Sequence, residues 1–229
     1  VLAPEIIGTE DAQRCKDACK YDAVDLDMEP KSITLQVGAV VWATGWEPYD
    51  ATKIDNLGFG QYENIITNMM MERMASPNGP TRGKILRPSD QSAPESVVFV
   101  QCAGSRDENH LPYCSYICCM ASLKQATYVR ERYPDAKIYI FYIDIRSPGQ
   151  RYEKFYQKVK EDENIFLIKG KVAEVNEDPA TKKVTVTAEN AVTGEKMHQE
   201  TDLVVLATGM QPTTASIQLP ADLQVTADG

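Results

Sequence analysis

Four of the chain's six cysteines fall within eighteen positions, at Cys102, Cys114, Cys118 and Cys119. The first follows a strand-like apolar run at 97–101, and the last two precede an amphipathic stretch at 122–133 that Pro134 ends. If one helix held Cys114 and Cys118, their Cβ atoms would be neighbours about 5–6 Å apart. Thiols from a strand end and a helix start can therefore surround an object wider than a single atom.

Several chemistries use clustered thiols, and inert packing as small buried hydrophobes is the alternative to all of them. Structural zinc usually takes two Cys-x2–4-Cys pairs, a spacing that the adjacent Cys118 and Cys119 fit poorly. Iron–sulfur clusters accept irregular spacings because their ligands attach to separate irons. A helix N-terminus also supplies free N–H groups to an anionic cluster. The spacing favours an iron–sulfur cluster, with structural zinc and thiol–disulfide exchange as alternatives.

A second cysteine pair, Cys15 and Cys19, lies near the start of the chain. It faintly resembles the last part of a ferredoxin motif, but Lys20 stands where that motif has proline and the other cysteines are missing. A metal role and one buried face of a short helix both remain open for this pair.

Composition limits the classes of function. The 229 residues are 43% apolar and 25% charged, as in ordinary soluble proteins, and their net charge of −9 argues against a nucleic-acid surface. No apolar run reaches the ~18 residues needed to span a membrane, so direct membrane insertion is not expected. Six cysteines without a secretory leader pattern predict a reducing, cytoplasmic compartment. We also expect the chain to be a segment of a longer polypeptide.

An internal repeat links the two ends of the chain. Residues 40–48, Val-Val-Trp-Ala-Thr-Gly-Trp-Glu-Pro, match residues 204–212, Val-Val-Leu-Ala-Thr-Gly-Met-Gln-Pro. Each unit is an expected buried strand, the first beginning near residue 32, that ends in Ala-Thr-Gly before a turn. Glycine at such a position lets the backbone approach a ligand or a neighbouring strand closely.

The remaining pattern predicts an α/β fold. A strand at 97–101, a helix to 133 and an apolar strand at 137–144 form a βαβ unit. A helix at 151–161, a strand at 165–168 and an antiparallel β-meander over 170–206 follow, and a further helix is expected at 62–75. We therefore predict a Rossmann-like, three-layer domain with a β-meander.

This arrangement resembles the two-dinucleotide-fold flavoproteins of the thioredoxin-reductase and disulfide-reductase type. The resemblance implies that Ala43, Thr44 and Gly45 lie beside FAD, and that Ala207, Thr208 and Gly209 close the second nucleotide domain. In that family, Gly-x-Gly-x-x-Gly follows the strand equivalent to 97–101 and holds a pyrophosphate. Here the cysteine turn takes its place, so NAD(P)H binding is doubtful.

A narrower resemblance rests on four motifs: Gly-Pro-Thr-x-Gly at 79–83, Arg-Pro-Ser-Asp at 87–90, Cys-x-Gly-Ser-Arg-Asp at 102–107 and Tyr-Cys-Ser-x-x-Cys-Cys-Met at 113–120. They are similar to the A subunits of heterodisulfide reductase and of the quinone-interacting membrane-bound oxidoreductase. The resemblance implies a [4Fe–4S] cluster on Cys102, Cys114, Cys118 and Cys119, beside FAD. The segment contains no full ferredoxin-like insert, which favours the quinone-interacting branch.

The resemblance also implies a function and a domain plan. The function is that of an oxidoreductase subunit that passes electrons between FAD and the cluster, and onward to iron–sulfur and membrane quinone-reactive partner subunits. The segment alone is expected to be inactive, and no acid–base constellation marks a catalytic residue. The expected parts are 1–75 as a partial FAD domain, 76–95 as a hinge, 96–212 as the cysteine-bearing domain and 213–229 as a return to the FAD domain. Arg106 is expected either to tune the cluster or to pair with Asp107.

Overall fold

The computed structural model describes residues 3–219 and 223–226, which divide into two compact units, Val1–Ala43 and Thr44–Gly229. In the first unit a short 3-10 helix, η1 (Pro4–Ile6), precedes the helix α1 (Glu10–Ala18). The described residues from 19 to 43 contain no strand. Among the described residues of this unit, Ala12 is the buried hydrophobic one.

The buried strand predicted from residue 32 to the first Ala-Thr-Gly is not present in the described structure. Its apolar side chains are exposed, for example 70% at Ile33, 74% at Leu35 and 87% at Val41. A strand is stable only when a neighbouring strand satisfies its backbone groups. No described segment pairs with these residues, so the β-branched pattern alone does not produce a strand here.

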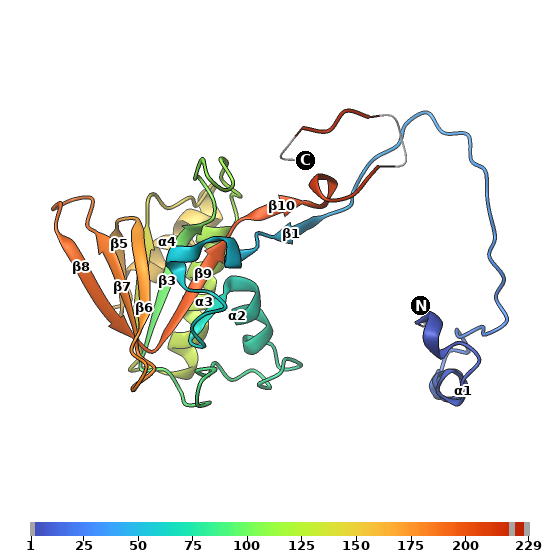
Figure 1. Cartoon of the computed structure of the whole chain (residues 1–229), viewed down its shortest axis with the longest axis horizontal. Helices are drawn as coiled ribbons and strands as arrows, with labels where there is room; N and C mark the ends of the chain where they lie inside the picture. Colours follow the sequence, from blue (N-terminus) through green and yellow to red (C-terminus); the bar gives the residue numbers. More distant parts are fainter. Residues whose placement is uncertain (1–2, 220–222, 227–229) are drawn as a thin grey trace. The chain divides into compact units, whose positions relative to one another are not determined.

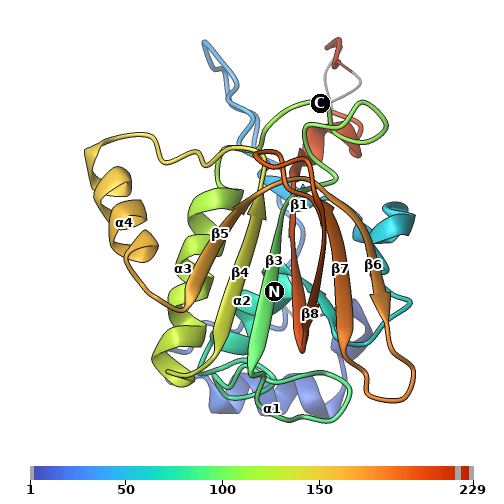
Figure 2. The ribbon, with the colours of Figure 1, turned by 90° about the vertical axis from the view of Figure 1, so that its left-hand side faces the viewer.

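The second unit is built on a five-stranded sheet whose neighbouring strands are all parallel. In spatial order the strands are β2 (Ile65–Thr67), β9 (Leu203–Thr208), β3 (Ser96–Ala103), β4 (Lys137–Tyr142) and β5 (Ile165–Lys169). Every residue of β9 is buried, as expected for a strand covered on both faces. Because parallel strands end at the same edge, the segments that follow β3, β4 and β9 meet there (Figure 2).

Helices cover one face of this sheet. They are α2 (Asn68–Ala75), α3 (Cys118–Arg132) and α4 (Gln150–Lys160). Val97 and Phe99, which alternate along β3, pack with Leu123 and Ala126 of α3 in one hydrophobic cluster. Figure 1 shows α2 and α3 on one side of β3 and β9, with β6, β7 and β8 on the other.

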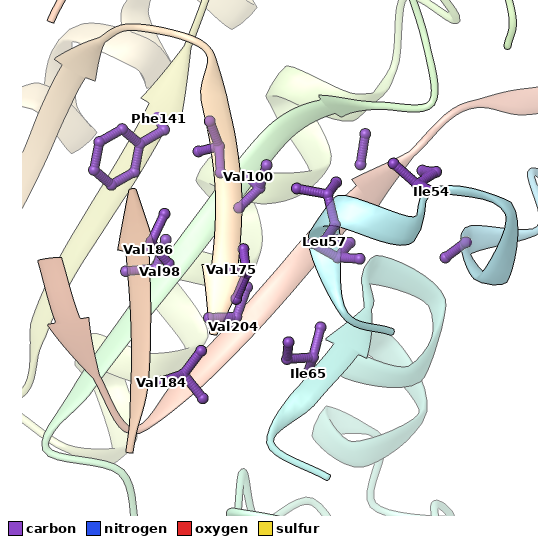
Figure 3. Close-up of a cluster of buried hydrophobic side chains, with 14 of the residues drawn as sticks. Ile54, Leu57, Ile65, Val98, Val100, Phe141, Val175, Val184, Val186 and Val204 are labelled. Atoms are coloured by element: carbon purple, nitrogen blue, oxygen red, sulfur yellow. The ribbon is translucent and has the colours of Figure 1, made fainter. Parts of the chain in front are cut away.

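An antiparallel meander covers the opposite face. Its strands are β6 (Val172–Glu177), β7 (Val184–Glu189) and β8 (Lys196–Thr201). Val98 and Val100 of β3 point to this side and cluster with Val175, Val184 and Val186 (Figure 3). The predicted Rossmann-like, three-layer α/β fold with a meander is therefore confirmed.

The ends of the two repeat units lie side by side. The strand β1 (Trp46–Pro48) pairs antiparallel with β10 (Met210–Pro212), as Figure 1 shows. The Tyr49 amide donates to the carbonyl of Gly209 (2.8 Å), and the Thr213 amide donates to that of Gly45 (3.3 Å). The repeat thus forms a two-stranded ribbon, followed by the 3-10 helix η4 (Thr213–Ala215).

The structure places one boundary differently from the sequence-based plan. Residues 44–75 belong to the cysteine-bearing unit, because β2 pairs with β9 and replaces the first part of the helix predicted at 62–75. Two 3-10 helices follow β1, namely η2 (Ala51–Lys53) and η3 (Asp55–Leu57). They bury Ala51 and Leu57 in the same hydrophobic cluster as Val98 and the meander. The segment 76–95, predicted as a hinge, buries Ile85 completely.

Two further features concern the limits of the chain. Part of the segment 213–229, predicted to return to the FAD domain, lies outside the described residues at 220–222 and 227–229. Among the helices that the structure describes, none combines the length and apolar character of a membrane span.

Candidate functional site

Cys102 occupies a bulge at the end of β3. Val100 is opposite Leu206 and Ala103 is opposite Thr208, so three steps along β3 match two along β9. The extra residue redirects the chain, and Cys102 has a φ of +57°, a left-handed conformation that costs a non-glycine residue about 1–2 kcal/mol. Strain of this kind concentrates at functional sites.

The other three thiols come from the start of α3 and the loop before it. Because α3 begins at Cys118, Cys114 precedes the helix, and the predicted pairing of Cys114 with Cys118 on one helix face is wrong. The Cys114 sulfur accepts a hydrogen bond from the Tyr116 amide (3.4 Å). The Cys118 thiol donates to the Thr208 carbonyl (3.6 Å) and the Cys119 thiol to the Asp144 carbonyl (3.7 Å). The end of β9 and the loop after β4 therefore contact the helix start.

The fold brings the four thiols together. Burial, together with the charges of Cys119, Cys102 and Cys114, raises the pKa of Cys118 to about 12. The pKa of Cys102 is raised to about 11, mainly by burial and also by the charges of Cys119 and Cys114, while Arg106 acts in the opposite direction. The pKa of Cys119 is also raised, first by burial. The four sulfurs therefore lie within electrostatic reach of one another, and all four are free thiols.

Two glycines permit the close packing around the thiols. A Cβ at Gly209 would lie 2.1 Å from Ser105 Oγ and 2.9 Å from Leu111 Cδ1. A Cβ at Gly104, whose φ is +70°, would lie 2.5 Å from the ring of Tyr49. All three distances are below van der Waals contact, so the cysteine turn fits against the end of β9 and Tyr49 only because these residues lack side chains.

Charged side chains flank the turn in a pattern that differs from the prediction. Arg106 pairs with Asp144 (2.6 Å), beyond the end of β4, and not with Asp107. Asp107 instead pairs with Lys171 (2.9 Å). Arg106 also lies near enough to the Cys102 thiol to lower its pKa, against the effect of burial. The guanidinium of Arg106 thus remains beside the thiols. Arg106 pairs with Asp144 because Asp144 follows β4 at the same edge of the sheet where β3 ends.

The two Ala-Thr-Gly triplets have different surroundings. Ala43, Thr44 and Gly45 are exposed. Ala207 and Thr208 are buried, and Thr208 Oγ1 donates to Asn68 Oδ1 (3.0 Å) while the Thr208 carbonyl accepts from Cys118. The second triplet therefore forms a wall of the cysteine site, whereas the first remains accessible for a ligand.

The donor set at this site is compatible with an iron–sulfur cluster. Among the described residues, no three Cys, His, Asp or Glu side chains are arranged to hold a single ion. Four thiols attached to separate irons need not converge on one point. Ile117, at the N-cap of α3, makes no side-chain capping bond, and the buried hydroxyl of Ser105 has no partner among the described residues. Both features leave polar groups available for an anionic group between the thiols.

Sequence reasoning missed three residues close to the thiols. Asp144 could have been found, because it follows β4 at the edge where the neighbouring strand that carries Cys102 also ends. Gln101 and Ser122 are buried polar residues that flank Cys102 and the start of α3. Gln101 ends the apolar run that predicts a strand, and Ser122 begins the amphipathic stretch that predicts a helix. Neither pattern marks these residues as part of a site.

The second cysteine pair, Cys15 and Cys19, belongs to the first unit and not to the unit that carries the four clustered thiols. Cys15 lies on α1, and Cys19 is at the C-cap of that helix, where its sulfur accepts a hydrogen bond from the Ala23 amide (3.4 Å). Cys15 is exposed and Cys19 is partly exposed, so the alternative of one buried helix face is wrong within the described residues. Their metal role stays a prediction.

The fold and the site define a Rossmann-like domain with a cysteine turn at its carboxyl edge. No protein-family model matches the chain. Similar solved structures include the thioredoxin reductase from Giardia duodenalis, which is 17% identical over 75% of this chain and 43% of that one, with a TM-score of 0.44. The thioredoxin reductase from T. acidophilum is also 17% identical, over 75% and 44%, with a TM-score of 0.42.

Curated relatives are much more similar in sequence. One of two iron–sulfur A subunits of heterodisulfide reductase in Methanopyrus kandleri is 44% identical over 82% of this chain and 29% of its own length. The iron–sulfur A subunit from Methanocaldococcus jannaschii is 43% identical over 86% and 30%. The A subunit of the ferredoxin/F420H2-dependent heterodisulfide reductase of Methanosarcina acetivorans is 44% identical over 88% and 25%.

Over the matched segment, the chain belongs to the family of heterodisulfide reductase A subunits, which are oxidoreductase subunits. The resemblance inferred from the motifs is thereby confirmed. The chain spans less than a third of the length of these relatives. Its relation to the quinone-interacting branch stays a prediction.

Proposed function

We propose that this chain forms the cluster-bearing part of an electron-transfer flavoprotein subunit. Cys102, Cys114, Cys118 and Cys119 would hold a [4Fe–4S] cluster, and the exposed Ala43, Thr44 and Gly45 would contribute to an FAD pocket completed by other residues. When bound, the two groups supply one- and two-electron redox chemistry. The NAD(P)H-binding alternative gains no support, because a cysteine turn occupies the position of a phosphate-binding turn.

The observation that carries this proposal is the meeting of four thiols at the carboxyl edge of the parallel sheet. Ligands of Rossmann-like folds bind at this edge. Here the bulge at Cys102, the close contact at Gly209 and the start of α3 bring the thiols within electrostatic reach. Four neighbouring thiols exceed the two that disulfide exchange requires.

The chain's own residues provide the electrostatic environment. The free amides at the start of α3 and the guanidinium of Arg106 place positive charge beside the sulfurs. Asp144 holds Arg106 in position through a 2.6 Å ion pair. These groups would favour the thiolate forms and an anionic cluster, even though burial alone raises the pKa of Cys102 and Cys118.

The direct test is the iron and acid-labile sulfide content of the anaerobically purified chain. We expect about four of each per chain, with an electron paramagnetic resonance signal after dithionite reduction. Cys118→Ser should lose the cluster. Cys15→Ser, which changes an exposed cysteine of the other unit, should retain it. Zinc without sulfide would favour a scaffold domain, and metal-free titratable thiols would favour thiol–disulfide exchange; either result contradicts the proposal.

Partners follow from the same proposal. The relatives are named as subunits of heterodisulfide reductases, and the name of one describes its reductase as ferredoxin/F420H2-dependent. We propose that this chain, in its whole polypeptide, passes electrons to other iron–sulfur subunits in the cytoplasm, with any membrane association made through partner subunits. Co-purification of a tagged whole polypeptide with iron–sulfur subunits would support this assembly, and a polypeptide that purifies by itself with active electron transfer would contradict it.

A further inference from the structure

Two buried side chains next to the thiols have polar atoms without partners. Gln101 is 6% exposed and Ser122 is fully buried. Within the described part of the chain, neither the amide nitrogen nor the amide oxygen of Gln101 makes a hydrogen bond, and the Ser122 hydroxyl makes none either. An unsatisfied buried polar group costs about 1–3 kcal/mol. One of these residues directly precedes Cys102 on β3, and the other lies one helical turn after Cys118 on α3.

The position of Ser122 on α3 directs it toward the thiols. It follows Cys118 by four residues and Cys119 by three, so its Cβ is a neighbour of both. Side chains of a helix lean toward its N-terminus, which places the Ser122 hydroxyl over the turn that carries the two cysteines.

Gln101 approaches the same place from the sheet. It directly precedes Cys102 on β3, before the bulge. Val97 and Phe99 pack in the helix-side cluster, so strand alternation puts Gln101 on that face too. Since β3 ends where α3 begins to cover the sheet, Gln101 lies at the level of the first turns of α3.

A second buried glutamine has partners for its amide nitrogen, whereas its amide oxygen has none among the described residues. Gln125, one turn beyond Ser122, donates from Nε2 to the carbonyl of Asn68 (2.9 Å) and to Glu72 Oε1 (3.1 Å). The helix layer therefore supplies acceptors to a buried amide group where one is needed. The amide nitrogen of Gln101 has no such acceptor among the described residues.

We propose that Gln101 and Ser122 are positioning residues whose N–H and O–H groups donate hydrogen bonds to the sulfur atoms of the cluster held by the four cysteines. This inference rests on the proposed function. Hydrogen bonds to sulfur stabilise the more negative, reduced state of a cluster, so each donor raises the reduction potential. The two residues would also determine the orientation of the group between β3 and α3.

The test compares four variants of the full chain, loaded anaerobically with Fe²⁺ and sulfide. Gln101→Met and Ser122→Ala remove the donors with little change in volume. Gln125→Met and Thr127→Val are matched controls, because Gln125 donates to Asn68 and Glu72 and Thr127 donates to the Lys124 carbonyl. The readouts are the midpoint potential from an electron paramagnetic resonance titration and the melting temperature of the cluster-free protein.

We expect Gln101→Met and Ser122→Ala to shift the midpoint potential to more negative values, each by about a tenfold change in the reduction equilibrium, which is 59 mV for one electron. The controls should leave the potential unchanged. In the cluster-free protein, the two donor variants should melt at the same or a higher temperature because a buried unsatisfied group is removed, whereas Gln125→Met should melt at a lower one.

Potentials equal to those of the controls would overturn this inference alone, because the wild-type chain would still hold its cluster. A wild-type chain without iron and sulfide would overturn it together with the proposed function. If a donor variant holds less iron, the melting temperature decides. A retained melting temperature supports a role toward the cluster, and a lowered one, as in Gln125→Met, reveals a merely structural role and overturns the inference.

Discussion

At the scale of single residues, the thiol turn depends on contacts that allow no additional atoms. Gly209, directly after β9, is the point at which the backbone touches Ser105 and Leu111. The Ser115 hydroxyl accepts a hydrogen bond from the amide of Met210 (2.7 Å), which fixes the loop between Cys114 and α3 to the same backbone. The distance between the thiols and the end of β9 therefore depends on the missing side chain of Gly209.

Gly209→Ala should disturb this contact. The added methyl group must displace Ser105 or Leu111, so we expect a loss of about 1–3 kcal/mol in the free energy of unfolding and a lower iron content after anaerobic loading. Urea unfolding and iron analysis measure both effects. Gly38→Ala is the control, because a Cβ at that position has no heavy atom within 4 Å. Equal iron and equal stability in the two variants would contradict the assigned role of Gly209.

At the scale of elements, an ion pair joins α3 to the segment that enters β5. Arg130 Nε donates to both carboxylate oxygens of Asp162 (3.0 and 2.9 Å), and the Asn164 amide donates to the same carboxylate (2.9 Å). Burial raises the pKa of Asp162, but the bonds from Arg130 and Asn164 outweigh it and hold the pKa below its ordinary value of 3.8. The charged carboxylate therefore stabilises the helix that begins at the thiols.

Asp162→Asn should remove this contribution. A carboxylate with a lowered pKa in the folded state stabilises the protein fully above its unfolded-state pKa and loses this effect as the pH falls through the folded-state value. We expect a loss of about 1 kcal/mol at pH 7, which shrinks in acid below about pH 4. Urea unfolding at several pH values measures it, with the exposed Asp135→Asn as the control. A difference that stays constant down to pH 2 would rule out the charge as its cause.

At the scale of the whole molecule, the hydrophobic core and the thiol site belong to the same unit. The buried side chains of both clusters run from Tyr49 to Leu206, and the four clustered cysteines lie between these limits. The first unit, Val1–Ala43, contributes Ala12 to the buried hydrophobic residues that the structure describes. Stability and the proposed cluster site should therefore depend on the second unit.

Deletion of residues 1–43 should leave the unfolding transition of the remaining chain intact. We expect the same urea midpoint as for the full chain and the same iron content after loading, because neither core cluster loses a residue. Circular dichroism and iron analysis of both chains provide the comparison. A clearly lower midpoint would show that the described core is incomplete without the first unit.

The local features of this protein follow from its amino-acid sequence. The amphipathic period of 122–133, the apolar runs at 97–101 and 137–144 and the turn residues of the meander predict α3, β3, β4 and β6–β8, because side-chain period and turn chemistry act over a few residues. The clustering of four cysteines and the motifs around them also indicated the site and the family before any fold was known.

Features that depend on distant residues emerge only in the folded chain. In the folded chain the two repeat ends pair as β1 and β10, and β2 joins the parallel sheet. The apolar run from residue 32 stays exposed. These outcomes depend on strand pairing, which joins segments far apart in the chain. The fold also places Asp144 against Cys119 and Arg106, and it buries Gln101 and Ser122. Those positions follow from the order of parallel strands and the start of α3, which no local pattern encodes.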